Sequence, residues 1–168
     1  MRPSDCGGGD TMRVSVWVAV VCPVTNRVLL AKRGPTTRNA GRWNFFGGGI
    51  DDGEHPEDTA LRELAEEAGI SAARDDLIYL GHCQTGTKRN LLFVVTTQSE
   101  FAPAINHESQ DWCWVALSDL LALRRLHGPT QKLSPLLRQW LETLPKTQPA
   151  ASQSRWEWLL SQVSRCWG

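Results

Sequence analysis

Carboxylates are concentrated in one short stretch of this chain, Gly47 to Ile70, although the chain as a whole carries no net charge. Eight acidic side chains and a single basic one, Arg62, fall within GGGIDDGEHPEDTALRELAEEAGI. Like charges this close repel one another, so the arrangement lowers stability unless something compensates. Clustered oxygen ligands suit Mg²⁺ or Mn²⁺, and Mg²⁺ commonly bridges carboxylates to substrate phosphates. The stretch therefore predicts a divalent-metal site.

A helix is predicted to present these carboxylates, because Pro56 suits its first position and Gly69 suits its end. At about 100° per residue, the helix has an apolar side and an acidic side about 100° wide. The apolar side is predicted to comprise Leu61, Leu64, Ala65 and Ala68, and the acidic side Glu63, Glu66 and Glu67. The alternative is an ordinary solvated surface in which Arg62 pairs with Glu66.

Three features favour a metal site over a solvated surface. Glu54 stands in the loop just before the helix, where it can fold back beside the acidic side. The glycines of residues 47–49 permit the tight backbone geometry that brings this loop close. Only Arg62 is interleaved among the acids, so ordinary salt bridges cannot neutralise them all.

The same stretch resembles the Nudix box, G-x5-E-x7-R-E-U-x-E-E-x-G-U, in which U is an aliphatic residue. Every specified position is matched, by Gly48, Glu54, Arg62, Glu63, Leu64, Glu66, Glu67, Gly69 and Ile70. Upstream, Trp43, Phe45, Gly47 and Gly48 match the common lead-in W-x-F-P-G-G, in which Phe46 replaces the proline. The resemblance implies an α/β fold, the Nudix α/β/α sandwich with a mixed β-sheet, and hydrolysis of a nucleoside diphosphate linked to another moiety.

The resemblance also implies roles for individual residues. The expected metal ligands are Gly48, Glu63, Glu66, Glu67 and Glu108, with Mg²⁺ as the cofactor and Mn²⁺ as a substitute. Glu54 would assist this shell or relay a proton, and Arg62 would orient the acids through ion pairs. The proton acceptor is left open between Glu66 or Glu67 and Glu108, which lies in the loop before a strand. The alternative for Glu108 is an exposed loop carboxylate.

Basic and aromatic residues upstream of the box are candidates for substrate binding. Arg33, at the end of a predicted strand, is a candidate for the terminal phosphate. Arg38 and Arg42, in the loop that follows, could contact the base or a phosphate. Trp43 could stack on a base or could simply belong to the core.

Three segments are expected along the chain: a flexible tail over residues 1–11, a Nudix hydrolase domain over 12–144, and a linker with a Trp-rich C-terminal helix over 145–168. Strands are predicted over residues 13–22, 27–33, 42–51, 75–84, 90–98 and 111–117. Ser118 and Gly128 are predicted to bound a second helix, and a third is predicted over 130–144, interrupted or kinked by Pro135. The C-terminal helical extension could form a homodimer or partner contact.

Several functional classes remain, and the sequence ranks them. Subfamily specificity signatures are mostly missing, which leaves a nucleoside triphosphate pyrophosphohydrolase as the leading prediction. A nucleotide-sugar hydrolase of the GDP-mannose or ADP-ribose type is the alternative, and a non-catalytic nucleotide-binding Nudix module is the alternative from another class. Lys plus Arg equals Asp plus Glu, 18 each, so no extended nucleic-acid surface is evident. No apolar segment is long enough for a membrane span and no signal peptide is evident, which favours a cytoplasmic location.

Overall fold

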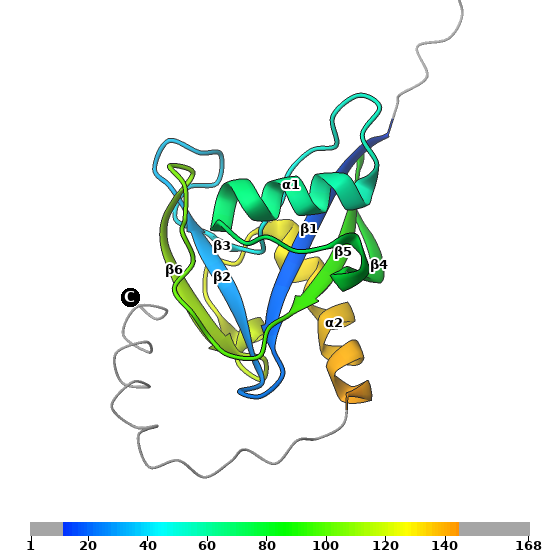
Figure 1. The fold of residues 1–168 in the computed structure, drawn as a ribbon. Helices are drawn as coiled ribbons and strands as arrows, with labels where there is room; N and C mark the ends of the chain where they lie inside the picture. Colours follow the sequence, from blue (N-terminus) through cyan, green and yellow to red (C-terminus); the bar gives the residue numbers. More distant parts are fainter. Residues whose placement is uncertain (1–11, 145–168) are drawn as a thin grey trace, which may run out of the picture.

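A mixed six-stranded sheet forms the centre of the computed structural model, which describes residues 12–144 (Figure 1). Its strands are β1 (Arg13–Cys22), β2 (Arg27–Arg33), β3 (Trp43–Asn44), β4 (Ile78–Thr85), β5 (Lys88–Thr96) and β6 (Ser109–Ala116). The order is β3-β2-β1-β5-β4, and β6 also pairs with β2. The pair β1–β5 is parallel and the other pairs are antiparallel. The predicted α/β sandwich with a mixed sheet is confirmed.

Helices α1 (Pro56–Ala68) and α2 (Gly128–Thr143) cover opposite faces of this sheet (Figure 1). Alternate residues of β1 enter the two cores, because successive side chains of a strand point to opposite faces. Val16, Val18 and Val20 pack with Leu64 on the α1 face. Trp17, Ala19 and Val21 pack with residues of α2 such as Leu133 on the other face. Burial of both faces explains why RVSVWVAVVC is almost continuously apolar.

The boundaries of α1 are those that the sequence predicts. Pro56 occupies the first turn, and Gly69 ends the helix in a left-handed conformation with a φ of 65°. The N–H of Gly69 donates to the Ala65 carbonyl and the N–H of Ile70 donates to the Leu64 carbonyl, as glycine C-caps commonly do.

The predicted buried side of α1 is correct for Leu64 and Ala68 but not for Leu61 and Ala65. Its buried residues are Thr59, Ala60, Leu64, Glu67 and Ala68, whereas Ala65 is exposed and Leu61 is only half-buried. The helix therefore turns Glu67 inward, where its carboxylate accepts a hydrogen bond from the backbone N–H of Gly47. Hydrophobicity alone could not reveal this contact, because it joins residues twenty positions apart.

The chain after β6 also differs from the prediction. No helix runs from Ser118 to Gly128; only a short 3-10 turn, Leu120–Ala122, forms there. Gly128 begins α2 rather than ending a helix, and α2 continues through Pro135 to Thr143. Arg125, with a φ of 63°, breaks the regular backbone just before α2. The predicted strand over residues 42–51 is reduced to β3 and isolated bridges from Phe46 and Gly49 to β1.

The predicted tail over residues 1–11 and the predicted Trp-rich helix over 145–168, with its dimer or partner contact, lie outside the described residues. Within residues 12–144, none of the helices has the length and apolar character that crossing a membrane requires.

Candidate active site

Glu67 is the buried acid of the cluster, with 6% of its surface exposed. Its Oε2 accepts a hydrogen bond of 2.8 Å from the N–H of Gly47. The pKa of Glu67 is raised to about 8, chiefly by burial. The charges of Glu63 and Glu108 contribute to this rise, and the hydrogen bond from Gly47 opposes it. Gly47 has a φ of 143°, and a Cβ there would lie 2.0 Å from the Val16 carbonyl oxygen, so only glycine fits this position.

Arg62 organises the remaining box acids as a branched ion pair. Its Nε and Nη2 donate to the two oxygens of Glu54 at 3.0 and 3.1 Å, which is a bidentate geometry. Its Nη1 donates to Glu63 Oε1 at 2.9 Å and to Glu66 Oε2 at 3.4 Å. Arg62 is therefore in contact with three of the box acids at once, Glu54, Glu63 and Glu66.

Glu54 is held more tightly than the sequence indicates. Thr59 Oγ1 donates to Glu54 Oε2 at 2.7 Å, and the N–H of Asp51 donates to the same oxygen at 3.2 Å. The hydrogen bonds from Arg62 and Thr59 lower the pKa of Glu54 to about 2. The Glu54 carboxylate is therefore ionised at neutral pH and is a weak proton acceptor.

Glu63 lies against the glycine loop. A Cβ at Gly48 would stand 2.5 Å from Glu63 Oε1, so the Gly48 backbone and the Glu63 carboxylate are in direct contact. Burial raises the pKa of Glu63, the Arg62 charge opposes this, and Glu66 and Glu108 add to the rise. Glu66 differs from Glu63, because 58% of its side chain is exposed and its ion-pair contact with Arg62 is longer, at 3.4 Å.

Glu108 comes from the loop before β6, a segment far from α1 in the sequence. The N–H of Gly34 donates to the Glu108 carbonyl at 2.7 Å, which joins this loop to the end of β2. The Glu108 charge raises the pKa of both Glu63 and Glu67, and the Arg33 charge lowers that of Glu67. Glu63, Glu67, Glu108 and Arg33 therefore share one electrostatic environment, although the residues come from three separate segments.

The donor set suits a hard divalent cation. In residues 12–144 no three acidic, His or Cys side chains are gathered as a ready metal-binding group. Several of the acids are instead bound by Arg62 and by the Gly47 N–H. Glu63 and Glu108 nevertheless raise the pKa of Glu67, and Glu66 and Glu108 raise that of Glu63, so these carboxylates repel one another when they are ionised. A divalent cation with oxygen preference would relieve that repulsion.

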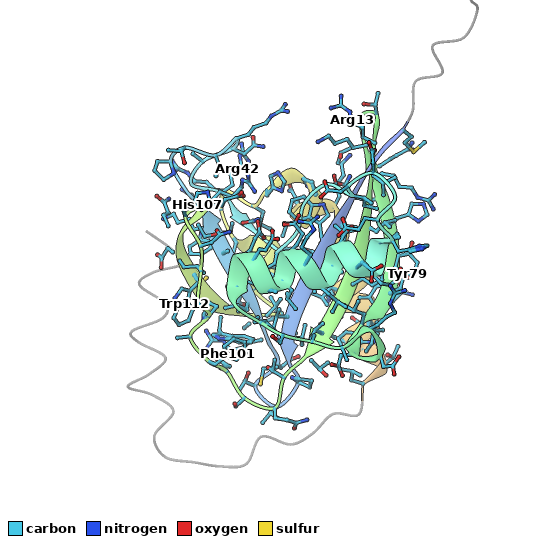
Figure 2. All side chains as sticks on the ribbon, turned by 45° about the horizontal axis from the view of Figure 1, so that its top comes forward. Arg13, Arg42, Tyr79, Phe101, His107 and Trp112 are labelled. Carbon is cyan, nitrogen blue, oxygen red and sulfur yellow. The ribbon has the colours of Figure 1, made fainter. Side chains whose placement is uncertain are left out.

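The predicted substrate-binding residues differ in their surroundings. Arg33 lies beside the cluster, and its Nε donates to the Arg38 carbonyl at 2.8 Å. Arg42 anchors the loop to the segment before α2 through a 3.1 Å bond from its Nη1 to the Leu126 carbonyl (Figure 2). Trp43 is 2% exposed and packs in the core, with Lys32 Nζ 5.4 Å from its ring centroid, so it offers no open face for stacking.

His127 is a residue of this region that the sequence does not single out. Its ring lies 5.1 Å from that of Trp17, and its buried Nδ1 has no hydrogen-bond partner. Burial and, to a smaller extent, the charges of Arg33, Arg42 and Lys88 together lower the pKa of His127 to about 4. Nothing in the local sequence LHGPT signals this, because Trp17 and the three cations come from distant segments.

Comparison with known proteins places this geometry in a family. The model of the NUDIX domain matches residues 11–137, which is more than half of the chain. The chain belongs to the NUDIX family. The Nudix box resemblance is thereby confirmed at the level of the whole domain.

Several curated Nudix relatives are similar over part of their length. A Proteus vulgaris "8-oxo-dGTP diphosphatase" is 36% identical over 41% of this chain and 62% of its own. A Mus musculus "Oxidized purine nucleoside triphosphate hydrolase" is 49% identical over 44% of each. A Mycobacterium tuberculosis "Putative 8-oxo-dGTP diphosphatase 3" is 33% identical over 76% of this chain and 59% of its own. The chain thus spans less than two thirds of these relatives.

Solved structures show the same fold. A MutT protein from Methanosarcina mazei Go1 has a TM-score of 0.62 at 22% identity, over 76% of this chain and 94% of its own. The E. coli dihydroneopterin triphosphate pyrophosphohydrolase has a TM-score of 0.60 at 19% identity, over 78% of this chain and 96% of its own. At these identities the likeness concerns the Nudix fold.

Proposed function

We propose that this Nudix protein is a Mg²⁺-dependent hydrolase that cleaves a phosphoanhydride of a nucleoside triphosphate, releasing pyrophosphate. The observation that carries the proposal is the shared environment of Glu63, Glu67 and Glu108 beside Arg33. Acids alone would repel a triphosphate, whereas acids that hold a cation next to an arginine would attract it. Divalent-metal dependence is general in the family that the chain belongs to.

In this proposal, Glu63, Glu66, Glu67 and Glu108, with the Gly48 backbone, would hold the cation. Bound Mg²⁺ would neutralise phosphate charge and acidify water at the site. Arg62 keeps Glu63 and Glu66 oriented, since it contacts both. Arg33 would bind phosphate oxygens through its guanidinium.

The proton acceptor is proposed to be Glu66, Glu67 or Glu108 rather than Glu54. A base with a pKa of about 2 takes up little proton at neutral pH, which makes Glu54 a structural support for Arg62 instead. Glu67 must lose the proton that its burial favours before it can bind a cation or act as a base, so activity is expected to rise toward alkaline pH.

Relatives support a triphosphate over a nucleotide sugar. The names of the Proteus vulgaris and Mus musculus proteins describe hydrolysis of nucleoside triphosphates with an oxidised purine, and a relative in Tolumonas auensis is named "RNA pyrophosphohydrolase".

A substrate panel tests this function. Full-length protein with Mg²⁺ would be incubated with dGTP, 8-oxo-dGTP, GDP-mannose and ADP-ribose in ¹⁸O-water, and products would be identified by mass spectrometry. We expect a nucleoside monophosphate and pyrophosphate from a triphosphate, and a loss of at least about 100-fold in Glu67→Gln but not in Glu142→Gln. Glu142 is an exposed residue of α2. Cleavage of only the sugar nucleotides would support the alternative substrate class, and binding without turnover would support a non-catalytic module.

A further inference from the structure

The segment between β5 and β6, residues 97–108, crosses the end of α1 and is tied to the domain along its length (Figure 1). At its start, Glu100 Oε2 lies 3.5 Å from Arg27 Nη1, and both side chains are nearly buried. Trp114 Nε1 donates to the Phe101 carbonyl at 2.9 Å, and the two rings meet edge to face at 5.7 Å. These contacts fix the first third of the segment to β2 and β6.

The middle of the segment is attached to the end of the helix that carries the box acids. The N–H of Ala104 donates to the Ala68 carbonyl at 3.0 Å. A Cβ at Gly69 would lie 2.8 Å from the Ala104 Cβ, so the two backbones are in close contact. The attachment lies one residue beyond Glu67 and couples the position of the segment to that of α1.

The far end of the segment is held at Glu108 itself. The N–H of Gly34 donates to the Glu108 carbonyl at 2.7 Å, and a Cβ at Gly34 would stand 3.0 Å from the same oxygen. The N–H of Glu108 donates to Asn106 Oδ1 at 2.9 Å. Both backbone polar groups of Glu108 are therefore bound, although the residue is exposed and its loop is not part of a strand.

We propose that Gly34 and Asn106 are positioning residues for Glu108, which they hold at a fixed place opposite the box acids of α1. The inference rests on the proposed function, because it assigns Glu108 a role in binding the cation. Metal-ligand distances tolerate only about 0.2 Å of error. A methyl group at Gly34 would lie 3.0 Å from the Glu108 carbonyl oxygen, so the Glu108 backbone would have to shift by a few tenths of an ångström, which is as large as the distance range of a metal ligand.

A double-mutant cycle tests the proposal. Gly34→Ala, Asn106→Ala and Glu108→Gln would be made singly, and the first two would also be combined with Glu108→Gln. Mn²⁺ affinity without nucleotide, by calorimetry, and kcat/KM with a triphosphate would be measured for each. Gly128→Ala is the matched control, because a Cβ at Gly128 would have no atom within 4 Å.

Gly34→Ala and Asn106→Ala are expected to weaken Mn²⁺ binding and kcat/KM by about 10-fold, and by less than about 2-fold once Glu108 is already Gln. Gly128→Ala should change neither quantity by more than about 2-fold. Equal losses with and without the Glu108 carboxylate would overturn the proposal, since they would show a general structural effect, as would unchanged binding in both single variants. If Gly34→Ala does not fold, Asn106→Ala carries the test. A protein that neither binds Mn²⁺ nor cleaves any triphosphate would instead refute the proposed function itself.

Discussion

Replacing Glu67 by Gln is expected to stabilise the metal-free protein at alkaline pH. The folded state raises the pKa of Glu67 from an ordinary 4.5 to about 8. Between these values the folded protein binds more protons than the unfolded chain, so the free energy of unfolding falls as pH rises. Gln carries no charge at any pH, and its amide oxygen can still accept the hydrogen bond from the Gly47 N–H.

The size of the effect follows from the shift. Because one pKa unit corresponds to about 1.4 kcal/mol, the easier ionisation of Glu67 in the unfolded chain lowers the free energy of unfolding by about 3 kcal/mol at pH 7 and about 5 kcal/mol at pH 9. Glu67→Gln should therefore match the parent protein near pH 4.5 and exceed its stability progressively at higher pH. Saturating Mg²⁺ should reverse the order, because it favours the ionised carboxylate of the parent protein alone.

The assay is urea denaturation at each pH unit from 5 to 9 in the presence of a chelator, with Glu142→Gln as the control for removing an exposed carboxylate. The expected result is a difference in unfolding free energy that grows with pH for Glu67→Gln and stays near zero for Glu142→Gln. Parallel profiles for the parent protein and Glu67→Gln, offset by a constant amount, would refute the conclusion that folding raises the pKa of Glu67.

Three further changes test other parts of the site. Gly48→Ala should weaken Mn²⁺ binding by about 10-fold in calorimetry, because its Cβ would lie 2.5 Å from Glu63 Oε1; a normal affinity would contradict this. Arg62→Lys should lower kcat/KM by about 10–100-fold in steady-state kinetics, since an ammonium cannot make the bidentate contact that Arg62 makes with Glu54. Unchanged kinetics would argue against the orienting role of Arg62. His127→Phe should reduce the stability lost as pH falls from 6.5 to 4 by roughly 1–2 kcal/mol, because the folded state disfavours the charged imidazole and the ring is partly solvated; unchanged acid denaturation curves would count against it.

The regular elements follow from local sequence, and this is why most of them could be predicted. Residues 13–22 and 27–33 are apolar and rich in β-branched side chains, and they form β1 and β2 with those bounds. Pro56 and Gly69 mark the ends of α1 through backbone preferences that operate within one turn. Ser118 and Gly128 are compatible with the ends of a helix, so the local sequence predicts a helix between them. The structure instead has a short turn there, with Leu120 and Leu126 buried, and Gly128 begins α2.

The chemistry of the site was only partly predictable. The box identifies Glu63, Glu66 and Glu67, but it does not separate the buried Glu67 from the exposed Glu66, because that difference arises from the contact with Gly47. The environment of His127 likewise depends on residues far away in the chain. Spacing within a helix is a local property, whereas burial and pKa depend on which distant segments fold against it.

The central claim is that the acids of α1 and Glu108 hold a divalent cation that is required to cut a phosphoanhydride. Calorimetric titration of the full chain with Mg²⁺ and Mn²⁺, with and without a non-hydrolysable triphosphate, tests it most directly when paired with turnover in excess chelator. We expect saturable binding that Glu67→Gln abolishes, tighter binding with the nucleotide, and no turnover in chelator. Absence of metal uptake in both titrations, together with turnover that survives the chelator, would contradict the claim.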